Sequence, residues 1–181
     1  ESGSINFEST EVRFILDKNN NPIDVYFKEG LSTNYLIEEF MLLANKAVAK
    51  HIGFPKNKAK TFVYRVHDIP DNDRIATLNN IVKKFGYTIN DASTNKLSSS
   101  LNHLLKNVKG KKEQQMVETL TIRSMAKAVY TTNNIGHYGL AFDYYSHFTS
   151  PIRRYPDLIV HRLLEKYLSG DKSINKDGLE K

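Results

Sequence analysis

One stretch of the sequence is more informative than any other, Tyr145-Ser146-His147-Phe148-Thr149-Ser150-Pro151-Ile152-Arg153-Arg154-Tyr155-Pro156-Asp157-Leu158. Arginines, a histidine, hydroxyl groups and a carboxylate surround a predicted helix start, with Ser150 as the cap and Pro151 in the first turn. The amino terminus of a helix offers unpaired N–H groups, and an arginine can fork onto phosphate oxygens. The stretch therefore predicts a phosphate-binding neighbourhood, although it would also suit a capped helix whose arginines pair with internal carboxylates.

Hydrophobic spacing on either side of this stretch predicts the remaining elements. The last helix should run to Leu168, with a kink or a broken first turn at Pro156. Alternating residues predict a β-hairpin from Val12–Leu16 and Ile23–Phe27. Further helices are predicted over Thr33–His51, Asp71–Gly86, Ser98–Leu105 and Met116–Tyr130, and short strands over Phe62–Val66 and Leu140–Tyr145. Because helices and strands do not alternate strictly, the fold class is α+β, mostly helical with a β-hairpin and short strands.

The predicted helix Thr33–His51 combines an apolar stripe with two acidic residues. Ser32 or Thr33 can cap its start. The stripe follows spacings of three and four and consists of Leu36, Phe40, Leu43, Ala44, Ala47 and Val48. Glu38 and Glu39 lie in the first part of this helix. Their negative charges can complement the helix dipole while the side chains are solvated, or one of the two can point to the side of the helix.

Two features suggest that the chain is part of a larger fold. An isolated hairpin is marginally stable, so its strands are expected to pair with a segment that could lie outside this chain. The first residue is Glu1 rather than Met, which suggests the middle of a longer protein or the remnant of a tag.

Composition and charge narrow the classes of protein. The 181 residues are 40% hydrophobic and 25% charged, as in a globular protein, and they include no cysteine. Disulfide frameworks, thiolate zinc sites and cysteine nucleophiles are therefore excluded, and a reducing cytoplasm is the expected location. The net charge of +6 favours an anionic partner such as nucleic acid or a membrane surface. The four lysines within 106–112 suit a solvated loop or, less commonly, a phosphate-facing patch. No apolar run is long enough to predict a membrane span.

Some polar pairs could carry chemistry. Asp157 and His161 lie four residues apart on one helix face, where they could ligate a metal or, more commonly, share a structural hydrogen bond. His67 and Asp68 could form an acid–base couple, although a capped strand end is the more common use of such a pair. No cluster of three or four carboxylates occurs in the sequence, and two-metal phosphoryl chemistry needs such a cluster.

The informative stretch and its surroundings closely resemble one family. Gly139–Leu158, followed by His161-Arg162, resembles the signature of the ribonuclease II / ribonuclease R family, whose catalytic domain is called RNB. The residues Arg153-Arg154-Tyr155-Pro156-Asp157 are most similar to the ribonuclease R branch. Three upstream segments match in the same order: Leu36–Asn45, Tyr64–Pro70 and Arg123–Tyr130. The resemblance implies that residues 1–168 are the C-terminal part of an RNB catalytic domain, followed by a polar, frayed tail over residues 169–181.

The resemblance also implies a function. Members of the family are processive 3′-to-5′ exoribonucleases that thread single-stranded RNA into a channel and hydrolyse it with Mg²⁺. The family holds this metal with aspartates in the first half of the domain, which is missing here, so the ligands are not in this chain and the chain alone is expected to be inactive. Cold-shock and S1 RNA-binding domains are expected to flank the domain in the parent protein.

The resemblance also implies roles for individual residues, at the positions that match the family's motif. Arg153 matches the arginine that contacts the phosphate near the scissile bond and is the predicted catalytic residue. Glu39 matches a glutamate in the channel, although Glu38 is adjacent and the register could be confused. The predicted RNA-binding set is Arg153, Arg154, Ser150, Thr149, Glu39 and Tyr155, and the predicted supporting set is His147, Asp157 and His161.

Two other functions remain compatible with the residues. One is a non-catalytic RNA-binding or scaffold protein that retains an RNB-like remnant. The other is a metal hydrolase that uses His147, Asp157 and His161.

Overall fold

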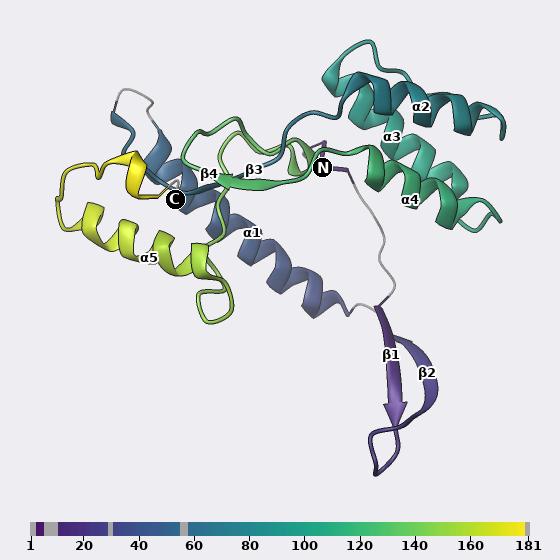
Figure 1. Cartoon of the computed structure of the whole chain (residues 1–181), viewed down its shortest axis with the longest axis horizontal. Helices are drawn as coiled ribbons and strands as arrows, with labels where there is room; N and C mark the ends of the chain where they lie inside the picture. The colour runs from purple at the N-terminus through teal and green to yellow at the C-terminus, as the bar shows by residue number, and fades with distance from the viewer. Residues whose placement is uncertain (1–2, 6–10, 29–30, 55–57, 180–181) are drawn as a thin grey trace.

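The computed structural model of the chain describes residues 3–5, 11–28, 31–54 and 58–179 (Figure 1). Its elements run in the order β1 (Glu11–Leu16), β2 (Pro22–Lys28), α1 (Ser32–Gly53), β3 (Tyr64–Val66), α2 (Asn72–Lys83), α3 (Thr94–Val108), α4 (Gln114–Ser124), β4 (Val129–Thr131) and α5 (Tyr155–Leu168). The strands form two antiparallel pairs, β1–β2 and β3–β4. The predicted α+β class, mostly helical with a hairpin and short strands, is confirmed.

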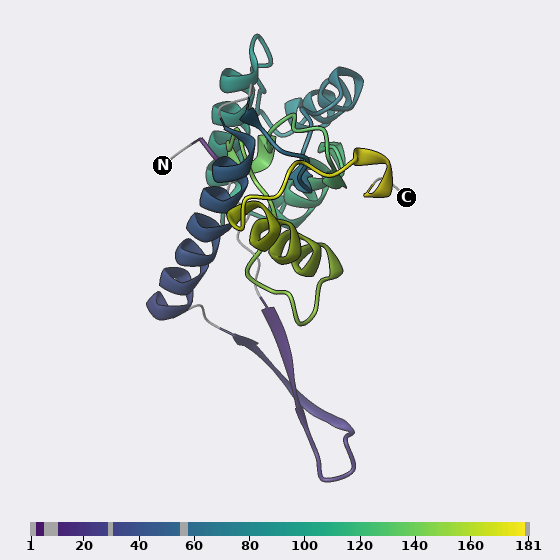
Figure 2. The same ribbon diagram turned by 90° about the vertical axis from the view of Figure 1, so that its left-hand side faces the viewer.

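The predicted hairpin is present and extends away from the rest of the chain (Figure 2). Asp17 closes its loop, since Oδ1 accepts hydrogen bonds from the backbone N–H groups of Asn19 (2.7 Å) and Asn21 (2.9 Å), a turn that Asp favours. Phe14 and Val25 are partners across the two strands. Both remain exposed, Phe14 to 59% and Val25 to 47%, so the hairpin presents apolar side chains to its surroundings.

Helix α1 is present as predicted, but its predicted apolar stripe is not its core face. Leu36, Phe40, Leu43 and Ala47 of the stripe are exposed, and the buried residues lie on the opposite side of the helix. The expected serine or threonine cap is replaced by Asn34, whose Oδ1 accepts a hydrogen bond from the N–H of Leu31 (3.1 Å). Near the C-terminal end, Ala49 and Ile52 are buried. The first half exposes a row of large apolar side chains, Leu31, Tyr35, Leu36, Ile37, Phe40 and Leu43. No helix in the described ranges, α1 included, is long and apolar enough to cross a lipid bilayer.

One hydrophobic core joins the end of α1 to β3 and α5. It consists of Ala49, Ile52, Phe62, Val63, Tyr64, Val66, Val160, Leu163 and Tyr167. The approach of α1 to β3 requires glycine at Gly53, because a Cβ there would lie 2.6 Å from Oη of Tyr64 and 2.8 Å from the ring of Tyr144. This core carries the surface on which the informative stretch lies.

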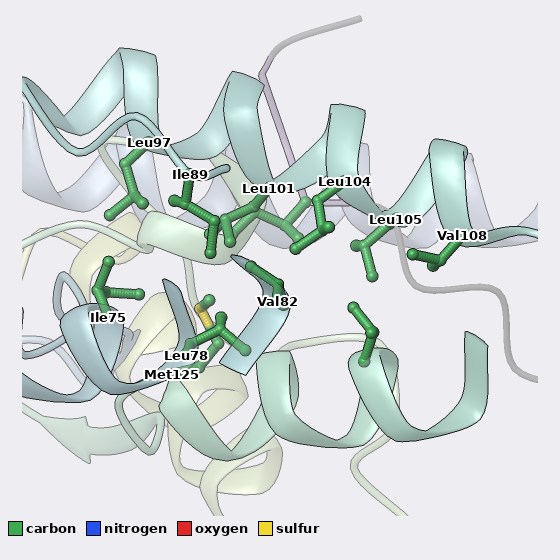
Figure 3. Close-up of a cluster of buried hydrophobic side chains, with 12 residues drawn as sticks. Ile75, Leu78, Val82, Ile89, Leu97, Leu101, Leu104, Leu105, Val108 and Met125 are labelled. Atoms are coloured by element: carbon green, nitrogen blue, oxygen red, sulfur yellow. The ribbon is translucent and has the colours of Figure 1, made fainter. Parts of the chain in front are cut away.

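Helices α2, α3 and α4 form a lobe around a second core (Figure 3). The core contains Ile75, Leu78, Val82, Leu97, Leu101, Leu104, Leu105, Val108 and Val117. Asp71 caps α2, and its Oδ1 accepts hydrogen bonds from the N–H groups of Asp73 (2.9 Å) and Arg74 (3.3 Å). Helix α3 is longer than predicted because Ser93, which accepts a hydrogen bond from the N–H of Lys96 (3.3 Å), starts it one turn earlier.

The predicted helix over Met116–Tyr130 is wrong in its second part. Helix α4 ends at Ser124, and residues 129–131 form β4, which pairs with β3. In the last turns of α4, side-chain hydroxyl groups donate hydrogen bonds to backbone carbonyl oxygens. Thr121 Oγ1 donates to the carbonyl oxygen of Val117 (2.8 Å), and Ser124 Oγ donates to the carbonyl oxygen of Thr121 (2.7 Å). The apolar spacing continued beyond Ser124, and only the pairing with β3 made those residues extended.

Two predictions around the informative stretch are also wrong. Residues 140–145 form no strand; a 3₁₀ turn at Tyr138–Leu140 leads into Ala141 at φ +53°. The last helix begins at Tyr155 rather than Ser150, and residues 151–153 form a turn. Pro156 explains the late start, because proline lacks an N–H and is tolerated only in the first turn of a helix. Ser150 is therefore not a cap, and Pro156 lies in the first turn of α5.

The C-terminal tail, which was expected to be frayed, makes specific contacts with the core. Lys60 Nζ donates to the carbonyl of Asp171 (2.6 Å), and Ser173 Oγ accepts a hydrogen bond from the N–H of Thr61 (2.8 Å). Ile174 and Leu179 pack against the core of α1, β3 and α5. Because the tail is mostly polar, its composition did not predict that these two apolar residues pack on the core.

Candidate nucleic-acid interface

Residues 145–155 form a loop, here called the motif loop, that leads into α5 and is fastened to β3 at its start. Ser146 is buried, and its Oγ donates a hydrogen bond to the carbonyl oxygen of Val63 (2.6 Å). The backbone N–H of Arg65 in β3 donates to the carbonyl oxygen of Tyr145 (3.0 Å). The first residues of the motif loop thus have a fixed position on the core.

Asn45 of α1 fastens the middle of the motif loop. Its side chain is buried, and Oδ1 accepts hydrogen bonds from the N–H groups of Phe148 (2.9 Å) and Thr149 (3.2 Å). Its Nδ2 donates to Oη of Tyr145 (3.3 Å). Asn45 lay within a segment that resembles the family, but no role was predicted for it. Asn45 lies opposite the predicted apolar stripe, so the spacing gave no sign of its burial.

His161 of α5 binds the middle of the motif loop, and the supporting role predicted for it stays a prediction. Its Nε2 donates a hydrogen bond to the carbonyl oxygen of Phe148 (2.8 Å), and the two rings stack with centroids 4.1 Å apart. Phe148 is therefore held from α1 through its N–H and from α5 through its carbonyl oxygen and its ring.

Asp157 binds the end of the motif loop, and the supporting role predicted for it stays a prediction. The side chain is completely buried, and Oδ1 accepts hydrogen bonds from the N–H of Ser150 and from Nη2 of Arg154, both at 2.8 Å. Arg154 was expected to contact RNA, but its guanidinium forms an ion pair with this carboxylate and its side chain is only 22% exposed. This is the internal pairing that the sequence left open as an alternative.

Arg153 lies on the exposed rim of the motif loop. Ile152 is fully exposed, Tyr155 is 69% exposed, and Arg153 between them is also exposed. A guanidinium can bind two phosphate oxygens at once, and a tyrosine ring can stack on a base. The predicted residues Ser150 and Thr149 are half-buried, and the buried Oγ1 of Thr149 has no hydrogen-bond partner in the described residues.

His147 belongs to the motif loop, and its side chain contacts β4. Its Nδ1 shares a hydrogen bond with Oη of Tyr130 in β4 (2.6 Å), and the guanidinium of Arg65 lies over the Tyr130 ring (4.6 Å). Burial, followed by the charge of Arg154, lowers the pKa of His147 to about 4. His147 is thus a neutral hydrogen-bonding group that joins the motif loop to β4, and the supporting role predicted for it stays a prediction.

A row of rings, which the sequence did not reveal, continues from His147. Tyr145 lies between the rings of His147 (5.6 Å) and His137 (5.3 Å), and His137 lies 5.0 Å from His67. Burial, followed by the neighbouring His67, lowers the pKa of His137 to about 4. These residues are up to 80 positions apart in the sequence, so no local pattern could have brought them together.

His67 and Asp68 do not form an acid–base couple. Nδ1 of His67 accepts a hydrogen bond from the N–H of Gly139 (2.9 Å), and its Nε2 donates to the carbonyl oxygen of Ala126 (2.8 Å). Asp68 is exposed and accepts a hydrogen bond from the N–H of Ile69 (2.8 Å). The pair closes a strand end, which was the more common of the two predicted uses.

Glu38 and Glu39 are both exposed on α1. Glu38 precedes Asn45 by seven residues, which is close to two full helical turns, so these two residues share a helix face. Glu39 lies about one third of a turn away from that face. The helix thus turns Glu38 toward the side on which the motif loop is bound, and the role predicted for Glu39 stays a prediction.

The metal-hydrolase interpretation finds no support in the geometry. Within residues 3–5, 11–28, 31–54 and 58–179, no three His, Asp or Glu side chains gather closely enough to hold a metal ion. His147, Asp157 and His161 each form a hydrogen bond with another part of the protein instead. The arrangement can bind an anion through Arg153, but the described residues offer no set of metal ligands beside it.

Comparisons with known proteins agree on one family. The family model described as "RNB domain" matches residues 1–170. Ribonuclease R of Thermotoga maritima is 42% identical over 180 residues, 98% of this chain and 24% of that protein. Ribonuclease R of Aquifex aeolicus is 39% identical over 175 residues, 95% of this chain and 24% of that protein. The chain therefore spans about a quarter of the length of these relatives.

A solved structure shows the same fold. The RNase R of Mycoplasma genitalium, in complex with ribose-methylated single-stranded RNA, superposes with a TM-score of 0.82 at 30% identity and covers 99% of this chain and 28% of that one. The family model accounts for nearly the whole chain, and the relatives align across it without a major gap in coverage. The chain belongs to the RNB domain family.

Proposed function

We propose that residues 1–168 are the C-terminal part of the catalytic domain of a 3′-to-5′ exoribonuclease, followed by a tail over residues 169–181, and that this part holds the RNA. The observation that carries the proposal is the motif loop, which is fixed by Asn45, His161 and Asp157 and presents Arg153 at its exposed rim. The ribonuclease R relatives and the RNA complex of a related RNase R support RNA as the substrate.

The role of Arg153 follows from its position. A guanidinium held on a fixed loop can bind a phosphate near the scissile bond and stabilise the charge that develops on it during hydrolysis. Tyr155 can stack on a neighbouring base. The pairing of Arg154 with Asp157 keeps the loop in place while Arg153 remains available.

Mg²⁺ is part of the proposal for the full-length protein only. The described residues do not provide a set of metal ligands, so we assign the ion to carboxylates outside this chain. The bound ion would neutralise charge on the phosphate and activate water. It follows that the chain alone should not hydrolyse RNA. Processive action, flanking RNA-binding domains and a cytoplasmic location also belong to the proposal.

The test is the substitution Arg153→Ala in the full-length protein that contains this chain. We expect kcat for a single-stranded RNA to fall by about 100-fold or more, with a smaller effect on binding, because the lost interaction strengthens in the transition state. Arg162→Ala, which removes an exposed arginine from α5, is the matched control and should leave kcat within about twofold.

Unchanged kcat in the Arg153→Ala variant would refute the assignment of Arg153. The rival function, a non-catalytic RNA-binding protein, predicts that the unmodified full-length protein shows no Mg²⁺-dependent hydrolysis at all. Calorimetric titration of the same protein with Mg²⁺ gives an independent reading, since a protein without a metal site should show no stoichiometric binding.

A further inference from the structure

The far end of the helical lobe carries six lysines, Lys83, Lys84, Lys106, Lys109, Lys111 and Lys112, which we call the basic tip. They come from the last turn and C-cap of α2, the last turn of α3 and the turn between α3 and α4, and all six are exposed. Figure 1 shows this end of the lobe on the right, on the opposite side of β3 and β4 from α5. The basic tip is thus separate from the motif loop.

Tyr87 joins the two parts of the basic tip. It follows α2, and its Oη donates a hydrogen bond to Oε1 of Glu113 (2.8 Å) at the start of α4. Nζ of Lys111 donates to the same Oη (2.7 Å). These contacts bring the lysines after α2 beside those after α3, although more than 20 residues separate them in the sequence.

The basic tip contains almost all the excess positive charge of the chain. Its six lysines and the adjacent Glu113 have a net charge of +5, and the whole chain has +6. The remaining 20 basic residues are therefore nearly balanced by 19 acidic residues. Lysines in the last turns of α2 and α3 also complement the helix dipoles, but this does not explain Lys111 and Lys112, which lie beyond both helices.

We propose that the basic tip binds the phosphate backbone of RNA, at a segment distant from the 3′ end that the motif loop holds. Lysine ammonium groups bind phosphates as point charges and release counterions from the nucleic acid. Phe85, which directly follows Lys84 and is 45% exposed, offers a ring on which a base can stack. That the anion is RNA rests on the proposed function. The positive charge of the basic tip and its location come from the structure itself.

The test compares two variants of the full-length protein that lose equal charge. The tip variant combines Lys83→Gln, Lys84→Gln, Lys106→Gln and Lys112→Gln, and it spares Lys111 because of its bond to Tyr87. The control combines substitutions to glutamine at four exposed lysines elsewhere, Lys18, Lys166, Lys172 and Lys176. A version of the tip variant with arginine at the four positions retains the charge and should retain wild-type binding.

The measurement is the affinity for a single-stranded RNA of about 30 nucleotides as a function of salt. Loss of two phosphate contacts should reduce the slope of log K against log salt by about 1.4 and weaken binding about 25-fold at about 0.1 M salt. The control should change affinity by less than about threefold. Turnover of an oligonucleotide too short to reach the basic tip should be unchanged in all variants.

Equal slopes in the tip variant and the control would overturn the proposal. So would a tip variant that loses binding to phosphatidylserine vesicles but keeps its affinity for RNA, because the anion would then be a lipid surface. A further outcome is that the unmodified protein hydrolyses no RNA while the tip variant still shows the reduced slope of log K against log salt. That result would refute the proposed exoribonuclease function and support RNA binding by the basic tip.

Discussion

At the residue scale, buried polar side chains determine the shape of the motif loop. Ser146, Asn45 and Asp157 are each at least nine-tenths buried, and each forms hydrogen bonds with backbone groups of the loop or of the residue before β3. An unpaired buried donor or acceptor costs about 1–3 kcal/mol, so alternative loop conformations that break these bonds are strongly disfavoured. The loop can therefore present Arg153 with little loss of entropy on binding.

His137 and His147 make the folded state sensitive to acid. The pKa of each is lowered from 6.5 to about 4, in both cases mainly by burial. The unfolded chain therefore binds more protons than the folded chain between about pH 6.5 and pH 4. We expect their contribution to stability to be complete above about pH 6.5 and to be lost as the pH falls through this window. The urea midpoint measured at a series of pH values should show this decline.

A double variant tests the origin of that decline. His137→Asn with His147→Asn retains hydrogen-bonding groups near the positions of Nδ1 but cannot take up a proton in this range. The dependence of the urea midpoint on pH should become shallower. His103→Asn, at an exposed position on α3, is the control and should leave the dependence unchanged. A double variant with the wild-type pH dependence would show that other groups are responsible.

At the element scale, α1 connects the core to the site. Its C-terminal half packs on β3 and α5, and Asn45 at its middle holds the motif loop. Helix α5 contributes from the other side through His161 and Asp157. Two helices that are more than 100 residues apart in the sequence thus share the task of positioning one loop.

Asn45→Leu should uncouple α1 from the motif loop. The substitution leaves the half-buried N–H groups of Phe148 and Thr149 without their acceptor, so we expect the free energy of unfolding to fall by about 1–3 kcal/mol. Asn80→Ala, on the exposed face of α2, is a control that should change stability by less than about 0.5 kcal/mol. Urea unfolding of the three proteins makes the comparison. Equal stability of Asn45→Leu and wild type would mean that the loop is held without this amide.

At the scale of the whole molecule, the described residues form two cores and leave two sets of apolar side chains exposed, which are here together called the apolar face. The cores lie in the lobe of α2–α4 and between α1, β3 and α5. The apolar face comprises the hairpin and the first half of α1, with exposed Phe14, Phe27 and Phe40 among others. Patches of this kind on a protein surface mark contacts with other protein surfaces.

The chain produced by itself should associate through this face. We expect its sedimentation coefficient to rise with concentration, and the combined substitutions Phe14→Lys, Phe27→Lys and Phe40→Lys should suppress the rise. The control carries the same charges at exposed apolar positions elsewhere, Ile69→Lys, Ile122→Lys and Leu168→Lys. A single species at all concentrations, or equal suppression by the control, would contradict this prediction.

Most of the elements could be predicted from sequence because their signals are local. The hairpin depends on alternation and Asp17, and α2 depends on the Asp71 cap and the spacing of its apolar residues. One error arose where a distant partner determined the conformation, and another where a local residue, Pro156, set the start of a helix. Residues 129–131 became a strand because β3 lies beside them, and the helix predicted from Ser150 started later because Pro156 could occupy only its first turn.

The sequence by itself determined the α+β class, the order of most helices and strands and the resemblance to the RNB family, and it predicted a phosphate-binding stretch around Arg153. Only the tertiary structure decided that Arg154 is paired while Arg153 is exposed, that Asn45 holds the loop, and that lysines from two separate segments form one basic tip. The physical reason is one of range. Turns, caps and periodicity depend on neighbours within a few residues, whereas burial, ion pairing and surface charge depend on residues that only folding brings together.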